Sequence, residues 1–209
     1  MSLLLLLACT TLSTLDGAKT LRPGADQASL AFGLQSGGNA LSTATGLPLP
    51  QIEVGYRHGL AEHLDAGVRL YLVGGVADLR YRFYQQGPWH AAFAPGVGGL
   101  VVPLPGTATM SAIDLRLPAI IERDLGSRLS LAGGPSVVGR WTPTWIVTPY
   151  GNGTVTRLDL LAGGSLRLRI GGDRVSVGLG GDAYHSAARA GRGSWSAGVD
   201  LRARTVGRE

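Results

Sequence analysis

The sequence predicts an all-β fold, namely a closed up-and-down antiparallel β-barrel of about ten strands, within a range of roughly 8 to 12. One observation behind this is that polar and apolar residues alternate along most of the chain, as in QIEVGYRHGL and LDAGVRLYL. A second is that glycine accounts for 33 of 209 residues and proline for only 11, which favours strands and close backbone approach over helices. This length fits one domain that can close a sheet on itself.

Charge and cysteine content narrow the function classes. The net charge is +5, but the basic residues are almost all arginines spaced along the chain beside acids, and Lys19 is the only lysine. No stretch forms the basic patch that nucleic-acid binding requires, so we expect no nucleic-acid partner. No apolar run approaches the roughly 18 to 20 residues of a membrane-spanning helix. The single cysteine, Cys9, has no partner for an internal disulfide.

Residues 1–27 are interpreted as a signal or lipobox segment followed by a flexible tether. The run MSLLLLLAC resembles a bacterial lipobox, which implies lipidation of Cys9 and anchoring of the mature chain. Residues 10–27 are polar and without pattern, as expected of a tether. Two alternatives stay open: an apolar amino-terminal strand with a buried cysteine, and a misassigned start site.

Residues 28–205 are predicted to form the barrel, and residues 206–209 a tail. Each alternating segment has nearly the length of a tilted membrane strand, about 9 to 11 residues. The segments are expected near residues 28–35, 51–59, 64–73, 75–85, 89–101, 109–123, 127–142, 156–170, 174–185 and 193–204.

The connections between these segments alternate between two kinds. GLAEHL, QQGP, DLGS and GGD are tight turns, whereas SGGNALSTATGLPLP, VPLPGTA, TPTWIVTPYGNGTV and SAARAGRG are longer and rich in Gly, Pro, Ser and Thr. The short Val73–Gly75 connection is the exception on the long-loop side. Short turns at one end and long loops at the other are typical of up-and-down outer-membrane barrels, with the short turns in the periplasm.

Charged residues gather on one face of the predicted strands and apolar residues on the other. We expect the charged face to line the interior as an ion-pair network. Its members are Glu53, Arg57, Asp65, Arg69, Asp78, Arg80, Arg82, Asp114, Arg116, Glu122, Arg140, Arg157, Asp159, Arg167, Arg169, Asp182, Asp200 and Arg202.

Alternation alone does not decide which face is inside, because a soluble barrel such as a lipocalin encloses its apolar face. Three details favour the membrane interpretation. The charged face combines arginine, rather than lysine, with acids, and it contains many glycines that leave room for long side chains. Aromatic residues on the apolar face lie near strand ends, as in the girdles at bilayer interfaces. These aromatics are Tyr56, Tyr81, Phe83, Trp89, Trp141 and Trp195.

With these features the chain resembles the small outer-membrane β-barrel proteins of Gram-negative bacteria, the class of the OmpA-like and OmpW-like barrels. The stretches GYRHGLAEHLDAGVRL and LPAIIERDLGSRLSLAGG carry the resemblance, together with the last strand. In that class the last strand holds an assembly signal, which Ser196, Gly198, Leu201 and Ala203 match here. The resemblance implies contact of Ser196, Gly198 and Leu201 with the barrel assembly machinery.

Catalysis finds little support in the sequence. Tyr184-His185-Ser186 with Asp182 invites comparison with outer-membrane lipid hydrolases, but adjacent strand residues point to opposite faces and the His-x-Ser spacing is absent. His58, His63 and His90 fall at turns or strand ends, and no ligand spacing indicates a metal. We therefore expect no enzyme activity, no cofactor and no metal.

The sequence thus favours a protein of the bacterial outer membrane, in contact with its lipid, that serves as a structural barrel or a small passive pore. An open interior would prefer anions weakly, because arginine exceeds acid. One alternative is a periplasmic, lipid-anchored barrel that binds an apolar ligand inside. An outer-membrane lipid hydrolase is a further alternative.

Overall fold

The structure of the chain, a computed structural model, describes residues 17–36, 48–72, 74–103, 108–148, 151–172, 174–187 and 193–205. The predicted lipidation site Cys9 and the tail 206–209 lie outside these residues. The strands are β1 Asp26–Ser36, β2 Leu49–Ala61, β3 Leu64–Tyr71, β4 Gly74–Gln86, β5 Trp89–Phe93, β6 Gly96–Pro103, β7 Ala108–Asp124, β8 Leu129–Thr148, β9 Gly151–Gly171, β10 Val175–Ser186 and β11 Gly193–Arg204.

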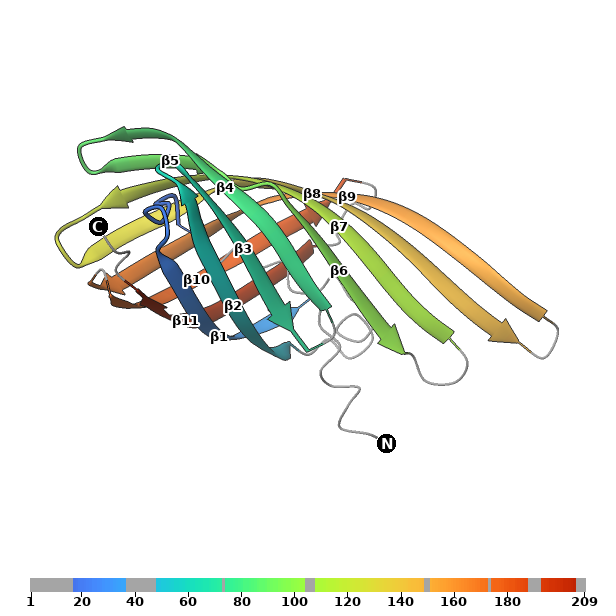
Figure 1. The fold of residues 1–209 in the computed structure, drawn as a ribbon. Coiled ribbons are helices and arrows are strands. Elements are labelled where there is room, and N and C mark those ends of the chain that lie inside the picture. Colours follow the sequence, from blue (N-terminus) through green and yellow to red (C-terminus); the bar gives the residue numbers. More distant parts are fainter. Residues whose placement is uncertain are drawn as a thin grey trace.

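The sheet closes on itself, which confirms the predicted antiparallel barrel (Figure 1). Apart from β5 and β6, strands that follow each other in the chain pair with each other, β1 also pairs with β11, and all pairings are antiparallel. Such a barrel has no open sheet edge around its circumference, so every strand satisfies its backbone N–H and C=O groups through its neighbours. The turns Glu62–His63, Gly87–Pro88 and Leu125–Arg128 lie at one end, called the short-turn end below, together with the start of β1 and the end of β11.

One position in the barrel is occupied by two short strands. The sequence predicts a single strand over 89–101, whereas β5 and β6 follow each other along it and both pair with β4 and β7. The interruption falls at Ala94 and Pro95, because proline has no N–H to give to a ladder. The Pro95 carbonyl still accepts the Leu79 N–H at 3.0 Å, and Ala94 N–H reaches the Pro118 carbonyl at 3.1 Å. The eleven strands therefore occupy ten positions.

The predicted loop TPTWIVTPYGNGTV is a second difference. β8 continues to Thr148 and β9 begins at Gly151, so most of this stretch is a two-stranded hairpin that extends beyond the rest of the barrel (Figure 1). Its Gly and Pro residues indicated a loop, but its Thr, Val, Ile and Trp residues favour strands and pair across the hairpin, as Trp145 does with Thr154.

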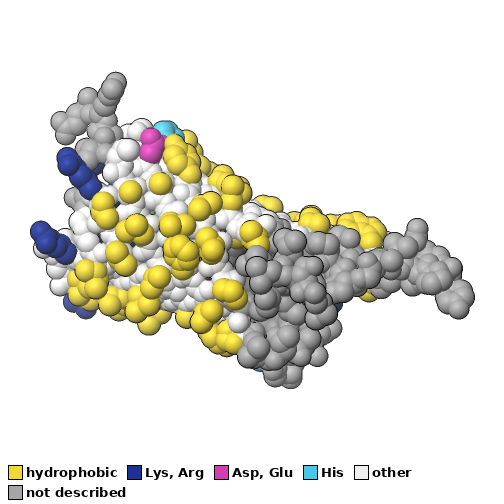
Figure 2. All heavy atoms as spheres, turned by 90° about the horizontal axis from the view of Figure 1, so that it is seen from below, with side chains coloured by type: hydrophobic (Ala, Val, Ile, Leu, Met, Phe, Trp, Pro, Cys, Tyr) yellow, Lys and Arg dark blue, Asp and Glu magenta, His cyan; other side chains and the backbone are white. Residues whose placement is uncertain are grey.

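The alternation along each strand places apolar side chains on the outside. Leu30, for example, is in register with Val54 on β2 and Leu201 on β11, and all three are exposed. Figure 2 shows hydrophobic side chains spread over the barrel wall, while the Lys and Arg side chains visible in this view gather at one rim. An exterior of this kind is stable in lipid and unfavourable in water.

Residues Gly17–Ala25, called the plug segment below, do not form the flexible tether expected from the sequence. Ala18, Leu21 and Ala25 are buried at the short-turn end of the barrel. The segment turns at Arg22-Pro23-Gly24-Ala25, where Ala25 N–H donates to the Arg22 carbonyl at 3.0 Å and Gly24 has a φ of 72°. Proline followed by glycine with positive φ suits a type II turn, which leads the chain from the barrel mouth into β1.

The outward face provides a test of the membrane interpretation. Val199, in the middle of β11 between Phe32 and Leu179, is exposed to the outside. Val199→Arg should lower the free energy of unfolding in lipid vesicles by about 2–4 kcal/mol, because it places a charge at mid-bilayer depth. Val175→Arg, at the start of β10, is the matched control and should cost only about 0–1 kcal/mol. Equal costs in urea titrations would contradict a membrane-spanning wall.

Candidate functional site: the charged barrel interior

The barrel interior is lined by charged side chains of both signs. Among the described residues, eight buried arginines face seven buried carboxylates. The arginines are Arg57, Arg69, Arg80, Arg116, Arg140, Arg167, Arg169 and Arg202, and the carboxylates are Glu53, Asp65, Asp78, Asp114, Glu122, Asp182 and Asp200. The near equality of these numbers matters, because an unpaired buried charge is far costlier than a paired one.

The first group of ion pairs lies on β2, β3 and β4. Asp65 is completely buried and accepts from Arg57 Nη1 at 2.5 Å and from Arg80 Nη2 at 2.6 Å. Arg57 also contacts Asp78, which in turn lies 3.4 Å from Arg69 Nη2. Each of these side chains faces the interior because strand residues two apart share a face. The register between β3 and β4 then places Asp65 directly opposite Arg80.

The second group joins β7 and β8. Asp114 and Arg140 are cross-strand partners, and the guanidinium holds the carboxylate through two bonds of 2.7 Å, from Nε and from Nη2. Arg116 Nη2 lies 3.4 Å from the same carboxylate. The bidentate geometry is the strong form of an arginine–carboxylate pair. Nearby on β9, Arg157 and Asp159 pair at 2.5 Å but are partly exposed.

The third group lies on β7, β9 and β11. Asp200 contacts Arg202 Nε at 2.6 Å and Arg167 Nε at 3.4 Å. Arg169 Nη1 is 3.7 Å from Glu122 Oε1, a longer and weaker pair. This group, like the first two, holds one more arginine than carboxylates, and two of its three pairs are 3.4 Å or longer.

Inward-facing glycines provide the space that the long side chains occupy. A Cβ on Gly67 would collide with the Arg57 guanidinium, and one on Gly178 would collide with the Asp200 carboxylate. A narrow barrel of about ten strands has little free interior volume, so small residues must face the large ones. The high glycine content of the sequence is therefore required by the packing of the interior.

The plug segment is bound to this interior by its backbone. Ala18 N–H donates to Glu122 Oε2 at 2.8 Å, and Leu21 N–H donates to Asp65 Oδ2 at 2.8 Å. The Gly17 carbonyl accepts from Arg80 Nη1 at 2.7 Å. Lys19 Nζ adds an ion pair to Asp124 at 2.5 Å. The sequence analysis predicted Asp65, Arg80 and Glu122 for the interior but missed that residues 17–21 bind to them, although the Pro-Gly turn signal that precedes β1 is visible in the sequence.

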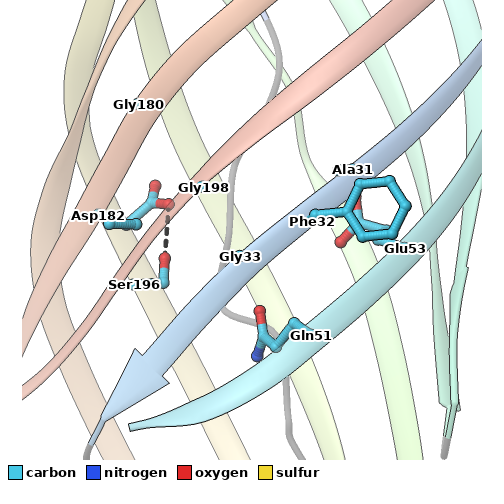
Figure 3. Close-up of a pocket in the computed structure, with 10 residues that line it drawn as sticks. Ala31, Phe32, Gly33, Gln51, Glu53, Gly180, Asp182, Ser196 and Gly198 are labelled. Atoms are coloured by element: carbon cyan, nitrogen blue, oxygen red, sulfur yellow. Dashed lines mark hydrogen bonds between the residues drawn. The ribbon is translucent and has the colours of Figure 1, made fainter.

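Toward the other end, Asp182, Ser196 and Glu53 lie on β10, β11 and β2 (Figure 3). Ser196 on β11 donates to Asp182 on β10 at 3.1 Å. Gly33, Gly180 and Gly198 meet in register beside this pair. Glu53 lies on β2 across from them, 3.9 Å from Arg69 Nη1, and is also buried.

Most of the residues predicted for the interior are thus brought together, and the exceptions lie toward the ends. Arg82 lies at the short-turn end, where it contacts the Glu62 carbonyl at 3.2 Å and His63 Nδ1 at 3.0 Å. Arg157 and Asp159 lie toward the protruding hairpin of β8 and β9.

All six predicted interface aromatics are exposed on the outer face. Tyr56, Tyr81, Phe83 and Trp89 lie toward the short-turn end, where Arg123 stacks over the Trp89 ring at 5.1 Å. Trp141 and Trp195 lie toward the opposite end, near the points where β1 and β7 approach their loops. Trp145, which the sequence placed in a loop, is also exposed there.

Two histidines contact carboxylates near the short-turn end of the barrel. His58 Nδ1 lies 2.7 Å from Asp26, and His90 Nε2 lies 3.3 Å from Asp124. His185 is exposed whereas Ser186 is buried, so the two point to opposite sides of the wall. Within the described ranges, no three His, Cys, Asp or Glu residues are arranged to hold a metal ion. The described chain contains no helix of the length and apolarity needed to cross a membrane.

Asp65 is the carboxylate whose loss should matter most. Asp65→Asn should lower the free energy of unfolding by about 3–5 kcal/mol, because it leaves Arg57 and Arg80 buried beside a neutral side chain. Asp159→Asn, in the partly exposed pair with Arg157, is the control and should cost about 1 kcal/mol or less. Urea titration of the refolded barrel, followed by tryptophan fluorescence, measures both. A similar cost for the two variants would contradict the importance of buried pairing.

Comparison with known proteins finds likeness at the level of three-dimensional structure. No family model and no curated protein matches the sequence. Among solved structures, the chain is similar to the surface protein NspA of Neisseria at 11% identity, with 86% of this chain and 95% of that one covered and a TM-score of 0.44. It is similar to Ail, the attachment invasion locus protein of Yersinia pestis, at 9% identity, covering 88% and 99%, with a TM-score of 0.48.

The translocator domain of the autotransporter NalP from Neisseria meningitidis is similar at 10% identity, covering 90% of this chain and 91% of that domain, with a TM-score of 0.47. The barrel's own features define its class. It is closed and antiparallel, its outward side chains are apolar, and its buried charges pair with one another inside the barrel. This chain has the architecture of a small outer-membrane β-barrel protein.

Proposed function

We propose that the protein is a structural barrel of the bacterial outer membrane whose interior is closed to passive flow. The plug segment is the observation that carries this proposal. It occupies the short-turn end and is held by Glu122, Asp65 and Arg80, which belong to β7, β3 and β4. A segment bound to three strands blocks a narrow lumen even without the ion pairs behind it.

The ion pairs form a second barrier in this proposal. A passing ion has to compete with arginine–carboxylate bonds of 2.5–2.7 Å on β2, β3, β4, β7 and β8. Breaking such buried pairs is costly, since each leaves a charge without its partner. A barrel for an apolar ligand, the periplasmic alternative, requires an apolar interior, and the described interior side chains are largely charged. We also propose no catalytic role for His185 and Ser186, which face opposite sides of the wall.

Measuring conductance in planar lipid bilayers tests whether the lumen is closed to ions. The full chain should give no steady conductance, whereas deletion of residues 17–24 should give small, discrete openings. Arg22→Ala, an exposed change on the same segment, is the control and should stay closed. The openings should prefer chloride over potassium only weakly, because the buried charges nearly balance. Steady conductance of the full chain would refute closure, and a closed deletion variant would refute the plug as the main barrier.

We further propose that β11 is recognised by the barrel assembly machinery through Ser196, Gly198 and Leu201. Leu201 is exposed on the outer face, where a membrane-embedded partner can reach it, whereas Ser196 is buried and Gly198 faces inward. Leu201 is therefore the residue of the three whose contact with the assembly machinery can be tested without disturbing the packing of the barrel interior.

Leu201→Ser should lower the amount of assembled barrel in cells several-fold, while leaving refolding of the purified chain into detergent unchanged. Leu179→Ser, an equally outward change on β10, is the control and should assemble normally. Assembly is measured by the shift in gel mobility between unboiled and boiled samples. Equal losses for both variants would contradict recognition through Leu201.

A further inference from the structure

A polar cavity of about 280 Å³ lies at the short-turn end, between the plug segment and the barrel wall. It is surrounded by the turns after β7 and β9, the start of β10 and the end of β11. Lys19, Arg128, Arg169 and Arg204 line it with positive charge, and Glu122 and Asp124 line it with negative charge. At roughly 30 Å³ per water, its volume corresponds to about nine waters, enough for a hydrated oxyanion.

The two carboxylates of the cavity already have partners. Glu122 Oε2 accepts the N–H groups of Ala18 at 2.8 Å and Lys19 at 3.3 Å. Asp124 accepts from Lys19 Nζ at 2.5 Å and lies 3.3 Å from His90 Nε2. Both oxygens of Asp124 and Oε2 of Glu122 therefore have partners, whereas Glu122 Oε1 makes no hydrogen bond in the described chain and faces Arg169.

Arg169 is the cation that this arrangement leaves undercompensated. Its side chain is 9% exposed, and its only ion pair, among the described residues, is the 3.7 Å approach of Nη1 to Glu122. In the described part of the chain, its Nε and Nη2 make no hydrogen bond. Nη1 of the neighbouring Arg202 makes none either. Buried guanidinium N–H groups without acceptors are costly, so an anion that accepts from them gains binding energy.

We propose that this cavity binds a phosphate-type oxyanion through Arg169 and Arg204. A guanidinium offers two parallel donors that match two oxygens of a tetrahedral anion. Arg204 lies at the end of β11, and its Nε donates to Gln27 at 2.8 Å, which orients the side chain at the cavity wall. Inorganic phosphate and the phosphate of a lipid headgroup share this chemistry. The site does not depend on whether the barrel conducts.

The test uses the full chain refolded in detergent and sodium phosphate as the probe, with chloride at equal ionic strength as the reference. Calorimetric titration should give saturable binding of one phosphate, and phosphate should raise the thermal midpoint more than chloride does. Arg169→Gln and Arg204→Gln should each weaken binding roughly tenfold, the expected loss of a charge-assisted contact. Arg174→Gln, an exposed arginine in the turn after β9, is the matched control and should bind like the parent.

Gel mobility before and after boiling verifies that each variant is folded, and Arg204→Gln serves if the buried Arg169→Gln fails to fold. Titration with short-chain phosphatidylglycerol in bicelles separates the sources: tighter binding than inorganic phosphate assigns the site to a headgroup, and weaker binding assigns it to the free anion. Absence of saturable phosphate binding, or equal weakening by Arg174→Gln, would overturn the proposal.

Discussion

Closure of the sheet is the constraint on which the rest of the structure depends. The pairing of β1 with β11 joins the two ends of the chain, and Thr205 N–H continues that seam by donating to the Asp26 carbonyl at 2.9 Å. Once the sheet is closed, each strand has one face toward the lumen and one toward the surroundings. Because the outward face is apolar, the charged residues of the inward face are enclosed together and must compensate one another.

This need for compensation explains the arginine-rich composition better than a nucleic-acid partner does. Arginine forms two directed bonds to one carboxylate, as Arg140 does with Asp114, and remains charged when buried. Glycines such as Gly67 supply the space that these side chains occupy. Composition, packing and electrostatics thus have one common cause, which is a narrow polar interior inside an apolar wall.

The interior is not uniform along the barrel axis. The short-turn end holds the plug segment, Asp65, Glu122 and the group around Arg169, whereas toward the other end Asp182 accepts a hydrogen bond from the Ser196 hydroxyl. The plug segment donates backbone N–H groups to two carboxylates of the interior: Asp65 keeps its bonds to Arg57 and Arg80, whereas Glu122 lies 3.7 Å from Arg169. Arg169 is thereby left with two N–H donors that make no hydrogen bond in the described chain, so the proposed closure of the lumen and the proposed anion site rest on one arrangement.

The sequence by itself determined that the barrel has about ten strand positions, which residues share a face along most strands, and that short polar turns lie at one end. These follow from a period of two that most of the strands obey, so the local pattern is enough to predict them. It misjudged the break at Pro95 and the hairpin of β8 and β9, where loop-forming and strand-forming residues are mixed and the pairing partner decides.

Only the tertiary structure decided which carboxylate meets which arginine and where the plug segment lies. Ala18 and Glu122 are 104 residues apart in the chain, and Leu21 and Asp65 are 44 apart. Such contacts depend on the register and closure of the whole barrel, and alternation within a strand carries no information about them. For the same reason, the residues before β1 looked like a tether: their backbone donors have partners only after the barrel has formed around them.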